Sequence, residues 1–214
     1  MPDSRQAYYK TENIAEKGEV LWQLAHPEPA ASVEWAAGYR ADMSDSFIDV
    51  RPIDPGSAGW VEQYINDRWA APLVIAHGVA FDPHQLPGYV ASIDGARVGL
   101  ATYHIDHMGC EIITLDSDQR GIGVGSALIC MVEEAAEQAG CSRLWLITSN
   151  DNLPALGFYQ RRGFELVAVH RRAIEQARQL KPQIPYIGFE GIPIRDEIEL
   201  ELPLPKQESD VAQR

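Results

Sequence analysis

A glycine-rich loop between a strand-like run and a helix-like run places the strongest constraint on the fold of this chain. Residues 119–126 read QRGIGVGS, after the apolar run 111–115 (EIITL) and before the run 127–136 (ALICMVEEAA). Glycines let the backbone turn tightly and expose its N–H groups. The first N–H groups of a helix lack intrahelical partners and lie at the positive end of its dipole. The sequence therefore predicts an α/β fold that holds a phosphorylated ligand at a helix N-terminus.

Length and charge limit the other functions of the chain. Its 214 residues fit one domain of ordinary size with room for an appendage. The net charge of −13 argues against binding to nucleic acid or to anionic membranes. No apolar run approaches the roughly 20 residues of a membrane-spanning helix, and the first residues do not form a signal peptide. The three cysteines have no metal-ligand spacing, so we expect a cytoplasmic protein without a metal.

Hydrophobic periodicity and turn residues predict a mixed α/β sheet with helices on its faces. An Asp94-Gly95 pair between two apolar runs is a strong hairpin signal. The predicted strands are 47–53, 73–76, 89–93, 97–105, 111–115, 143–148, 164–170 and 198–202. The predicted helices are 59–69, 124–139, 155–161 and 175–180.

The chain divides into three predicted parts. Residues 1–46 have the pattern of an N-terminal helical extension, which we expect to pack against the main domain or a second subunit of a homodimer. Residues 47–204 form the main domain. Residues 205–214 are polar and are expected to be a disordered tail.

Two familiar phosphate-binding loops fit the glycine-rich segment poorly. A P-loop requires Lys-Ser or Lys-Thr after its last glycine, whereas Ser126 and Ala127 follow Gly125. A dinucleotide-binding loop follows the first strand of its sheet, and an acidic residue ends the next strand. Here the loop comes late in the strand order, and the next strand ends in Ser149 and Asn150.

Two motifs together resemble the GNAT N-acetyltransferase superfamily. Residues 119–128 (QRGIGVGSAL) resemble its coenzyme A signature, Q/R-x-x-G-x-G/A, and residues 152–164 (NLPALGFYQRRGF) resemble its N-x-x-A-x-x-F-Y-x-x-x-G-F segment. The resemblance covers residues 47–204 and suggests a bacterial-type single-domain member. It implies a central, mostly antiparallel sheet with two splayed strands and helices on both faces, and acetyl-CoA as co-substrate with no metal.

The resemblance also implies which residues bind the donor. The pyrophosphate would lie on the backbone N–H groups from Gly121 to Ser126, with Arg120 and the Ser126 hydroxyl as further donors. The backbone of Leu115, Asp116 and Ser117 would hold the pantetheine arm and the acetyl carbonyl, because acetyl transfer builds negative charge on that oxygen. The complete predicted set is Leu115, Asp116, Ser117, Arg120, Gly121, Ile122, Gly123, Val124, Gly125, Ser126, Asn152 and Tyr159.

Two of these residues have an alternative role. Tyr159 matches the tyrosine that lies near the thioester sulfur in this family and is the candidate general acid, or it packs on the cofactor without a proton role. Asn152 binds the cofactor or caps the short helix that follows it.

Several side chains are candidates for the general base. Glu111 begins the strand that would carry the thioester, and a slip of one residue would turn it to the other face. His104 and His107 titrate near neutral pH and are alternatives, as is a water relay. The long segments 76–88 and 181–195 would shape the acceptor pocket, with Tyr186, Phe189 and Glu190 as lining residues, or the second segment is only a covering flap.

The expected activity is direct transfer of an acetyl group to a primary amine of a small molecule, or of a peptide N-terminus or lysine. Two alternatives remain open. The donor could be a longer acyl-CoA, or the protein could be a non-catalytic CoA-binding sensor.

Overall fold

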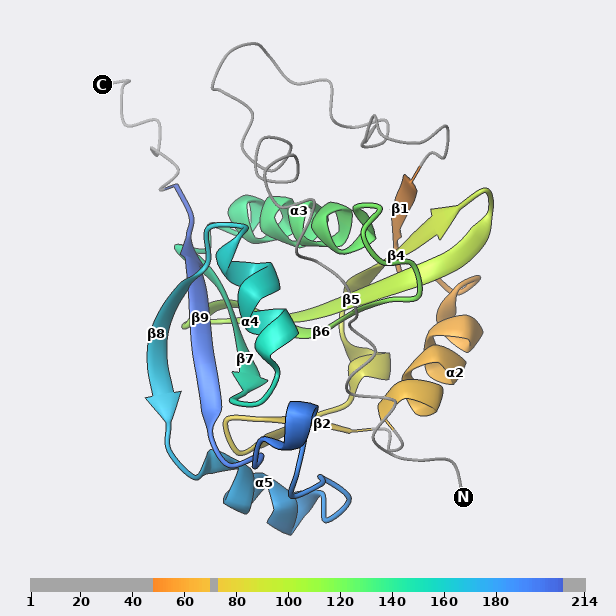
Figure 1. Ribbon diagram of the computed structural model, residues 1–214. Helices are drawn as coiled ribbons and strands as arrows, with labels where there is room; N and C mark the ends of the chain where they lie inside the picture. The colour runs from red at the N-terminus through yellow and green to blue at the C-terminus, as the bar shows by residue number, and fades with distance from the viewer. Residues whose placement is uncertain (1–47, 70–72, 206–214) are drawn as a thin grey trace, which may run out of the picture.

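A seven-stranded sheet forms the centre of the computed structural model, which describes residues 48–69 and 73–205 (Figure 1). The strands lie in the order β1-β4-β5-β6-β7-β9-β8, and every neighbouring pair except β6 and β7 is antiparallel. The sheet strands are β1 (Ile48–Pro52), β4 (Gly88–Ile93), β5 (Ala96–Asp106), β6 (Gly109–Ser117), β7 (Arg143–Ser149), β8 (Glu165–His170) and β9 (Glu197–Pro203).

The helices agree with those predicted to within two residues at each end. They are α2 (Ala58–Trp69), α3 (Val124–Gln138), α4 (Leu153–Gln160) and α5 (Ala173–Leu180), with short 3₁₀ helices η1 (Pro83–Gln85) and η2 (Phe189–Gly191). The predicted α/β class is thus confirmed. None of the helices in the described part of the chain is both long and apolar enough to cross a membrane. The predicted extension over residues 1–46 and nearly all of the predicted tail lie outside the described residues.

The sequence did not predict a second, two-stranded sheet. Strands β2 (Val74–Ala76) and β3 (Val79–Phe81) pair as a hairpin within a segment that we interpreted as mostly loop. His77 and Gly78 join them with φ values of +39° and +78°. Two successive positive φ angles are typical of a type I′ turn, whose twist suits a two-residue hairpin. Asp94 and Gly95 make the same kind of turn between β4 and β5, as predicted.

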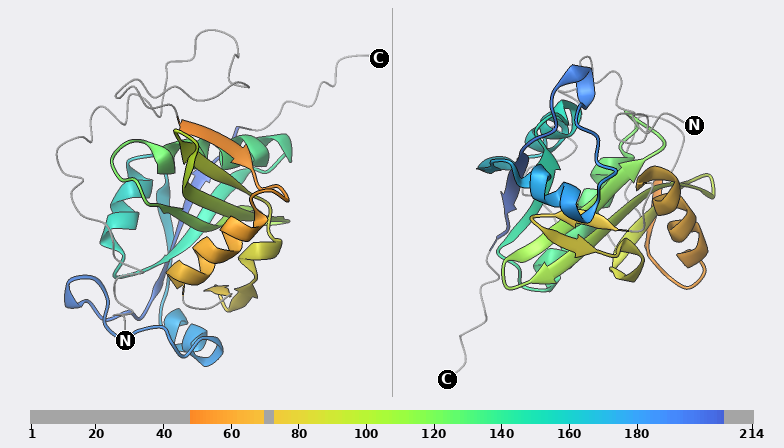
Figure 2. Two further views of the ribbon diagram at one scale, coloured as in Figure 1. Left: turned by 90° about the vertical axis from the view of Figure 1, so that its right-hand side faces the viewer. Right: turned by 90° about the horizontal axis from the view of Figure 1, so that it is seen from below.

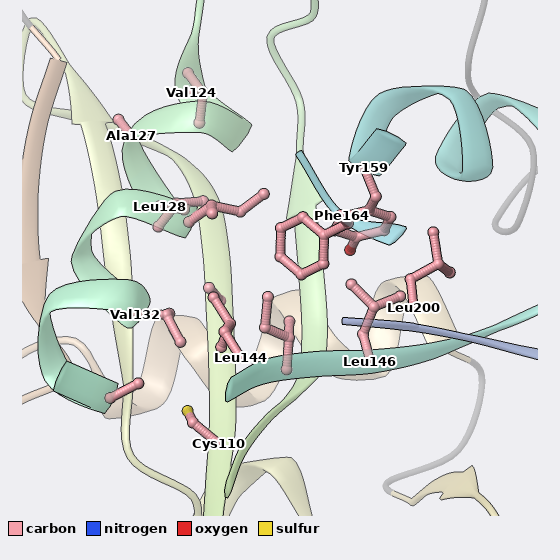
Figure 3. Close-up of a cluster of buried hydrophobic side chains, with 14 of the residues drawn as sticks. Cys110, Val124, Ala127, Leu128, Val132, Leu144, Leu146, Tyr159, Phe164 and Leu200 are labelled. Atoms are coloured by element: carbon pink, nitrogen blue, oxygen red, sulfur yellow. The ribbon is translucent and has the colours of Figure 1, made fainter. Parts of the chain in front are cut away.

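The helices cover both faces of the large sheet. On one face α3 and α4 bury the main core, which includes Leu128, Leu144 and Phe164 (Figure 3). On the other face α2 packs Val61 and Ile65 against the sheet. The hairpin β2–β3 lies between the sheet and α5, as the right-hand view in Figure 2 shows from below, and Ile75 packs against the buried side chains of α5.

Strands β6 and β7 separate along their length. They pair in parallel through only three residue pairs: Cys110 with Leu144, Glu111 with Trp145, and Ile112 with Leu146. Beyond these pairs β6 continues to Ser117 beside β5, and β7 continues to Ser149 beside β9. The sheet is therefore split in its interior, which confirms the splayed strands that the resemblance implied.

A β-bulge interrupts β6 just where the two strands begin to separate. Ile112 pairs with Tyr103 of β5 and Thr114 pairs with Thr102, so Ile113 is an additional residue without a partner on β5. An additional residue changes which side chains share a face. As a result Glu111 and Asp116, an odd number of positions apart, both lie on the α2 face.

Candidate active site

The glycine-rich loop enters α3 in a conformation that leaves the helix start open. Gly121 and Gly123 have φ values of +74° and +95°, where residues with a Cβ are disfavoured. Gly123 is the N-cap of α3, so no side chain caps the first turn. A Cβ at Gly121 would meet no atom within 4 Å. The loop thus presents uncapped N–H groups beside open space, and this geometry suits a phosphate group.

The first turn of α3 packs closely against α4. Ser126 is buried, and its hydroxyl accepts hydrogen bonds from Arg162 at 2.5 Å (Nη2) and 3.1 Å (Nε). The Arg162 guanidinium also lies 3.5 Å from the centroid of the Phe158 ring. Val124 is buried in the main core, so it can contribute only its backbone to a ligand. Arg162 was not among the predicted residues, although its position inside the second motif was a possible signal.

The unpaired part of β6 carries the backbone predicted to hold the pantetheine arm. The Asp118 N–H donates to Val98 O of β5. Hydrogen-bonding groups alternate along a strand, so the N–H groups of Leu115 and Ser117 point to the opposite edge, toward the split. The Ser117 N–H already has a partner, because it donates to Asp116 Oδ1 at 2.8 Å. The Asp116 carboxylate also pairs with Arg68 of α2. Among the three predicted residues, Leu115 has the best-placed backbone.

Asn152 and Tyr159 occupy the two ends of α4. Asn152 Oδ1 accepts from the Ala155 N–H at 3.4 Å, and its Nδ2 donates to Thr148 Oγ1 at 3.1 Å, so Asn152 caps the helix. Tyr159 is 7% exposed and packs against Phe158. It also packs against Phe164 (Figure 3). Burial raises the pKa of its phenol, with a smaller effect of the same sign from Asp116, while Arg162 lowers it. Tyr159 therefore keeps its proton at neutral pH.

Glu111 lies on the opposite face of β6 from Cys110, which is buried in the main core. Its side chain is 3% exposed, and Oε2 lies 3.0 Å from Nε2 of His77 in the β2–β3 turn. Its second oxygen, Oε1, has no hydrogen-bond partner among the described residues. Burial raises the pKa of Glu111, and the contact with His77 opposes that shift. Glu111 is thus a buried carboxylate of increased basicity beside the start of the split.

The two histidines considered as alternative bases have different surroundings. His104 faces Glu111 in the register of β5 and β6, and its ring packs 5.6 Å from that of Phe81. His107 lies in the exposed turn between the same strands, with 86% of its side chain accessible and Asp106 3.8 Å away. The histidine that touches Glu111 is His77, which the sequence analysis did not consider.

The segment 181–195 is anchored to the fold by several hydrogen bonds. Arg178 donates to the carbonyl oxygens of Pro185 and Ile194, and the Phe189 N–H donates to Asp151. Tyr186 is exposed beneath the Arg178 guanidinium, 4.3 Å away. Strand β9 contributes Glu197, Glu199 and Glu201 to the Glu111 face of the sheet. Glu199 and Glu201 both pair with Arg143, and Glu199 also lies 2.8 Å from His170.

A surface cavity of about 460 Å³ between β1, β4 and α2 contains none of the predicted site residues. It is lined by Asp49, Arg51, Trp60 and Arg97, among others. The candidate site is therefore located at the split between β6 and β7 and includes the groups around it.

Comparison with known proteins agrees with this geometry. A model of the acetyltransferase (GNAT) family matches residues 43–164. The uncharacterized protein YdhI of Bacillus subtilis is 47% identical over 133 residues, which cover 61% of this chain and 82% of YdhI.

Solved structures share the fold. The IAA acetyltransferase from Bacillus cereus has a TM-score of 0.54 at 22% identity, over 73% of this chain and 99% of that one. A GNAT family acetyltransferase from Elizabethkingia anophelis, solved with acetyl-CoA bound, has a TM-score of 0.52 at 19% identity, over 73% and 98% of the two chains.

Proposed function

The chain belongs to the acetyltransferase (GNAT) family, and on that basis we propose that it transfers the acetyl group of acetyl-CoA to a primary amine of a small molecule. One observation carries the proposal. The split between β6 and β7 begins beside the buried carboxylate of Glu111, and β6 leads directly into the uncapped start of α3. An extended, pyrophosphate-bearing thioester fits that arrangement.

The donor would be held mainly by backbone groups. The N–H groups at the start of α3 suit the pyrophosphate, and the Leu115 N–H suits the arm or the acetyl carbonyl. Arg162, close to this helix start through its bonds to Ser126, adds a positive charge. A neighbour of the same fold was solved with acetyl-CoA bound, which supports this assignment.

The reaction needs one base and one acid. Glu111 would accept a proton from the substrate ammonium, and the neutral amine nitrogen would attack the thioester carbonyl carbon. A C–N bond forms, the carbonyl oxygen becomes an oxyanion, and the C–S bond breaks as the oxyanion collapses. Tyr159 would give its proton to the departing thiolate, and the attacking nitrogen would lose its second proton to the resulting phenolate as it becomes an amide. The higher basicity of a buried Glu111 supports the first role, and the protonated state of Tyr159 supports the second.

Two buried carboxyl groups on the Glu111 face support an acceptor that arrives as a cation. Glu111 and Glu197 are both buried, and each has one carboxylate oxygen without a partner among the described residues. Such groups attract an ammonium and repel a carboxylate substrate. We therefore expect amines without a nearby negative charge to react fastest.

Calorimetry and a thiol-release assay test the proposal together. We expect acetyl-CoA to bind and free thiol to appear with some members of a panel of primary amines. Glu111→Gln should bind acetyl-CoA normally and lose about 10²-fold in kcat/KM, the usual contribution of a general base. Binding of CoA without turnover of any amine would indicate a sensor, and faster turnover of a longer acyl-CoA would change the donor. No binding at all would refute the proposal.

A further inference from the structure

His77 occupies a backbone position that disfavours its own side chain. It is the first residue of the two-residue turn between β2 and β3, with a φ of +39°. Asparagine, aspartate and glycine are the usual residues there, because they tolerate the left-handed region. A histidine in this position costs the turn some stability. Strain of this kind persists where the side chain has a function.

The imidazole of His77 is held in one place by its neighbours. Its ring centroid lies 5.7 Å from that of Phe81 and 5.6 Å from that of Trp145. The His77 backbone N–H lies close enough to the buried Glu197 carboxyl to lower its pKa. These contacts fix the turn against the sheet and direct Nε2 at Glu111 Oε2, 3.0 Å away.

The contact joins a buried group to a partly exposed one. The Glu111 side chain is 3% exposed and that of His77 is 32% exposed. Since a carboxylate oxygen only accepts, Nε2 must carry the hydrogen when Glu111 is ionised. That hydrogen bond leaves Oε1 as the buried carboxylate oxygen that has no partner among the described residues.

We propose that His77 is a positioning residue for the general base: it donates to Glu111 Oε2, orients Oε1, and keeps the buried carboxyl in its ionised, proton-accepting form. This inference rests on the proposed function, because it assumes that Glu111 is the base. His77 itself need not touch the substrate.

The other groups around Glu111 disfavour its ionised form, so a neighbour that favours this form is needed for the proposed role. Burial raises the pKa of Glu111, and Asp106 of β5 and Glu199 of β9 raise it further, while His77 lowers it. His104 lies opposite on β5, and Glu197 lies behind His77. Arg143 is engaged by Glu199 and Glu201. His77 is the neighbour that favours the charged form of Glu111.

The substitution His77→Asn separates a structural role from a functional one. Asparagine suits the turn better than histidine, so a purely structural His77 predicts an equal or higher Tm and unchanged kinetics. Our proposal predicts that Tm is kept while the acidic limb of the kcat/KM profile moves up by roughly one pH unit. At a pH below the limb this shift lowers kcat/KM about tenfold. His84→Asn, in the neighbouring η1, is the matched control and should change neither quantity.

A measurement on the free enzyme gives a readout besides activity. The Glu111 carboxyl carbon can be titrated by ¹³C NMR, with Glu111→Gln identifying its signal. We expect a higher Glu111 pKa in His77→Asn than in the wild type. An unchanged titration overturns the proposal, and so does a shifted titration with an unchanged pH profile. If the wild type transfers no acetyl group to any amine, the proposed function is refuted. That result is obtained before any variant is made and is therefore distinct from a failure of the His77 proposal.

Discussion

A Cβ atom at Gly125 would lie 2.9 Å from Cζ of the Phe158 ring, so the first turn of α3 and the C-terminal half of α4 meet at a position that admits only hydrogen. The glycine is helical and does not have a positive φ. Close packing, not backbone freedom, is therefore the reason for a glycine here.

We expect Gly125→Ala to destabilise the protein by about 1–3 kcal/mol, the usual cost of overpacking. Because Phe158 must move, Arg162 and Ser126 move with it, and acetyl-CoA should bind more weakly. Gly59→Ala is the matched control, since Gly59 is also helical and a Cβ there meets nothing within 4 Å. That change should stabilise by about 0.5–1 kcal/mol. Thermal unfolding measures both, and equal Tm values would contradict the packing argument.

Arg162→Met tests the positive charge near the helix start. Methionine preserves apolar contact with the Phe158 ring but cannot donate to Ser126. We expect the Kd for acetyl-CoA to rise about tenfold, as for the loss of one charge-assisted contact of about 1.4 kcal/mol. Arg161→Met, at the neighbouring position, should leave the Kd unchanged. Isothermal titration calorimetry decides the matter, and equal affinities for both variants would remove Arg162 from the donor site.

Tyr159→Phe removes one hydroxyl from a well-packed position. The ring contacts with Phe158 and Phe164 remain, so the affinity for acetyl-CoA should persist. We expect kcat to fall on the order of 10²-fold, because the thiolate would leave without its proton donor. Tyr103→Phe, a half-buried tyrosine of β5, is the control. A normal kcat in Tyr159→Phe would show that Tyr159 only packs on the donor.

Glu197 gives the protein a pH-dependent stability of known sign. The side chain is 2% exposed and burial raises its pKa, although His170 opposes the shift. A carboxyl whose folded-state pKa is raised stabilises the fold while it is protonated, and this contribution is lost as the pH rises through the folded-state pKa. Glu197→Gln should therefore raise Tm at pH 8, by about 2–4 °C for each kcal/mol recovered in a domain of this size.

The difference in Tm between Glu197→Gln and the wild type should shrink as the pH falls toward the ordinary glutamate pKa of 4.5. A series of thermal melts from pH 4.5 to pH 8 measures this trend. A difference that stays constant over the series would mean that Glu197 is neutral throughout or that the amide acts only through packing.

Short sequence patterns predicted those parts of the candidate site that are formed by residues close together in the chain. The glycines at 121 and 123 have the positive φ values that make a loop of this kind, and Asn152 caps α4 from its place in the second motif. These features depend on residues close together in the chain.

The missed features depend on contacts between distant residues. His77 meets Glu111 across 34 positions, and Arg162 meets Ser126 across 36. The three-residue strands of the β2–β3 hairpin are too short for periodicity to reveal, and His-Gly is a weaker hairpin signal than Asp-Gly. Neither the packing of a side chain nor its hydrogen-bond partner can be obtained from spacing when the segments are this far apart.

The additional residue Ile113 shifts the register of β6 against β5. Glu111 lies on one side of this shift, and the residues along the split, 114–117, lie on the other. Deleting Ile113 would change no other residue. If residues 114–117 kept their pairing with β5, the deletion would nevertheless turn Glu111 toward the α3 core. The proposed role of Glu111 as the base thus depends on the number of residues in this strand as much as on their identity. Single-residue deletions in β6 should be tolerated far less than substitutions, because a change of length exchanges the two faces of the sheet.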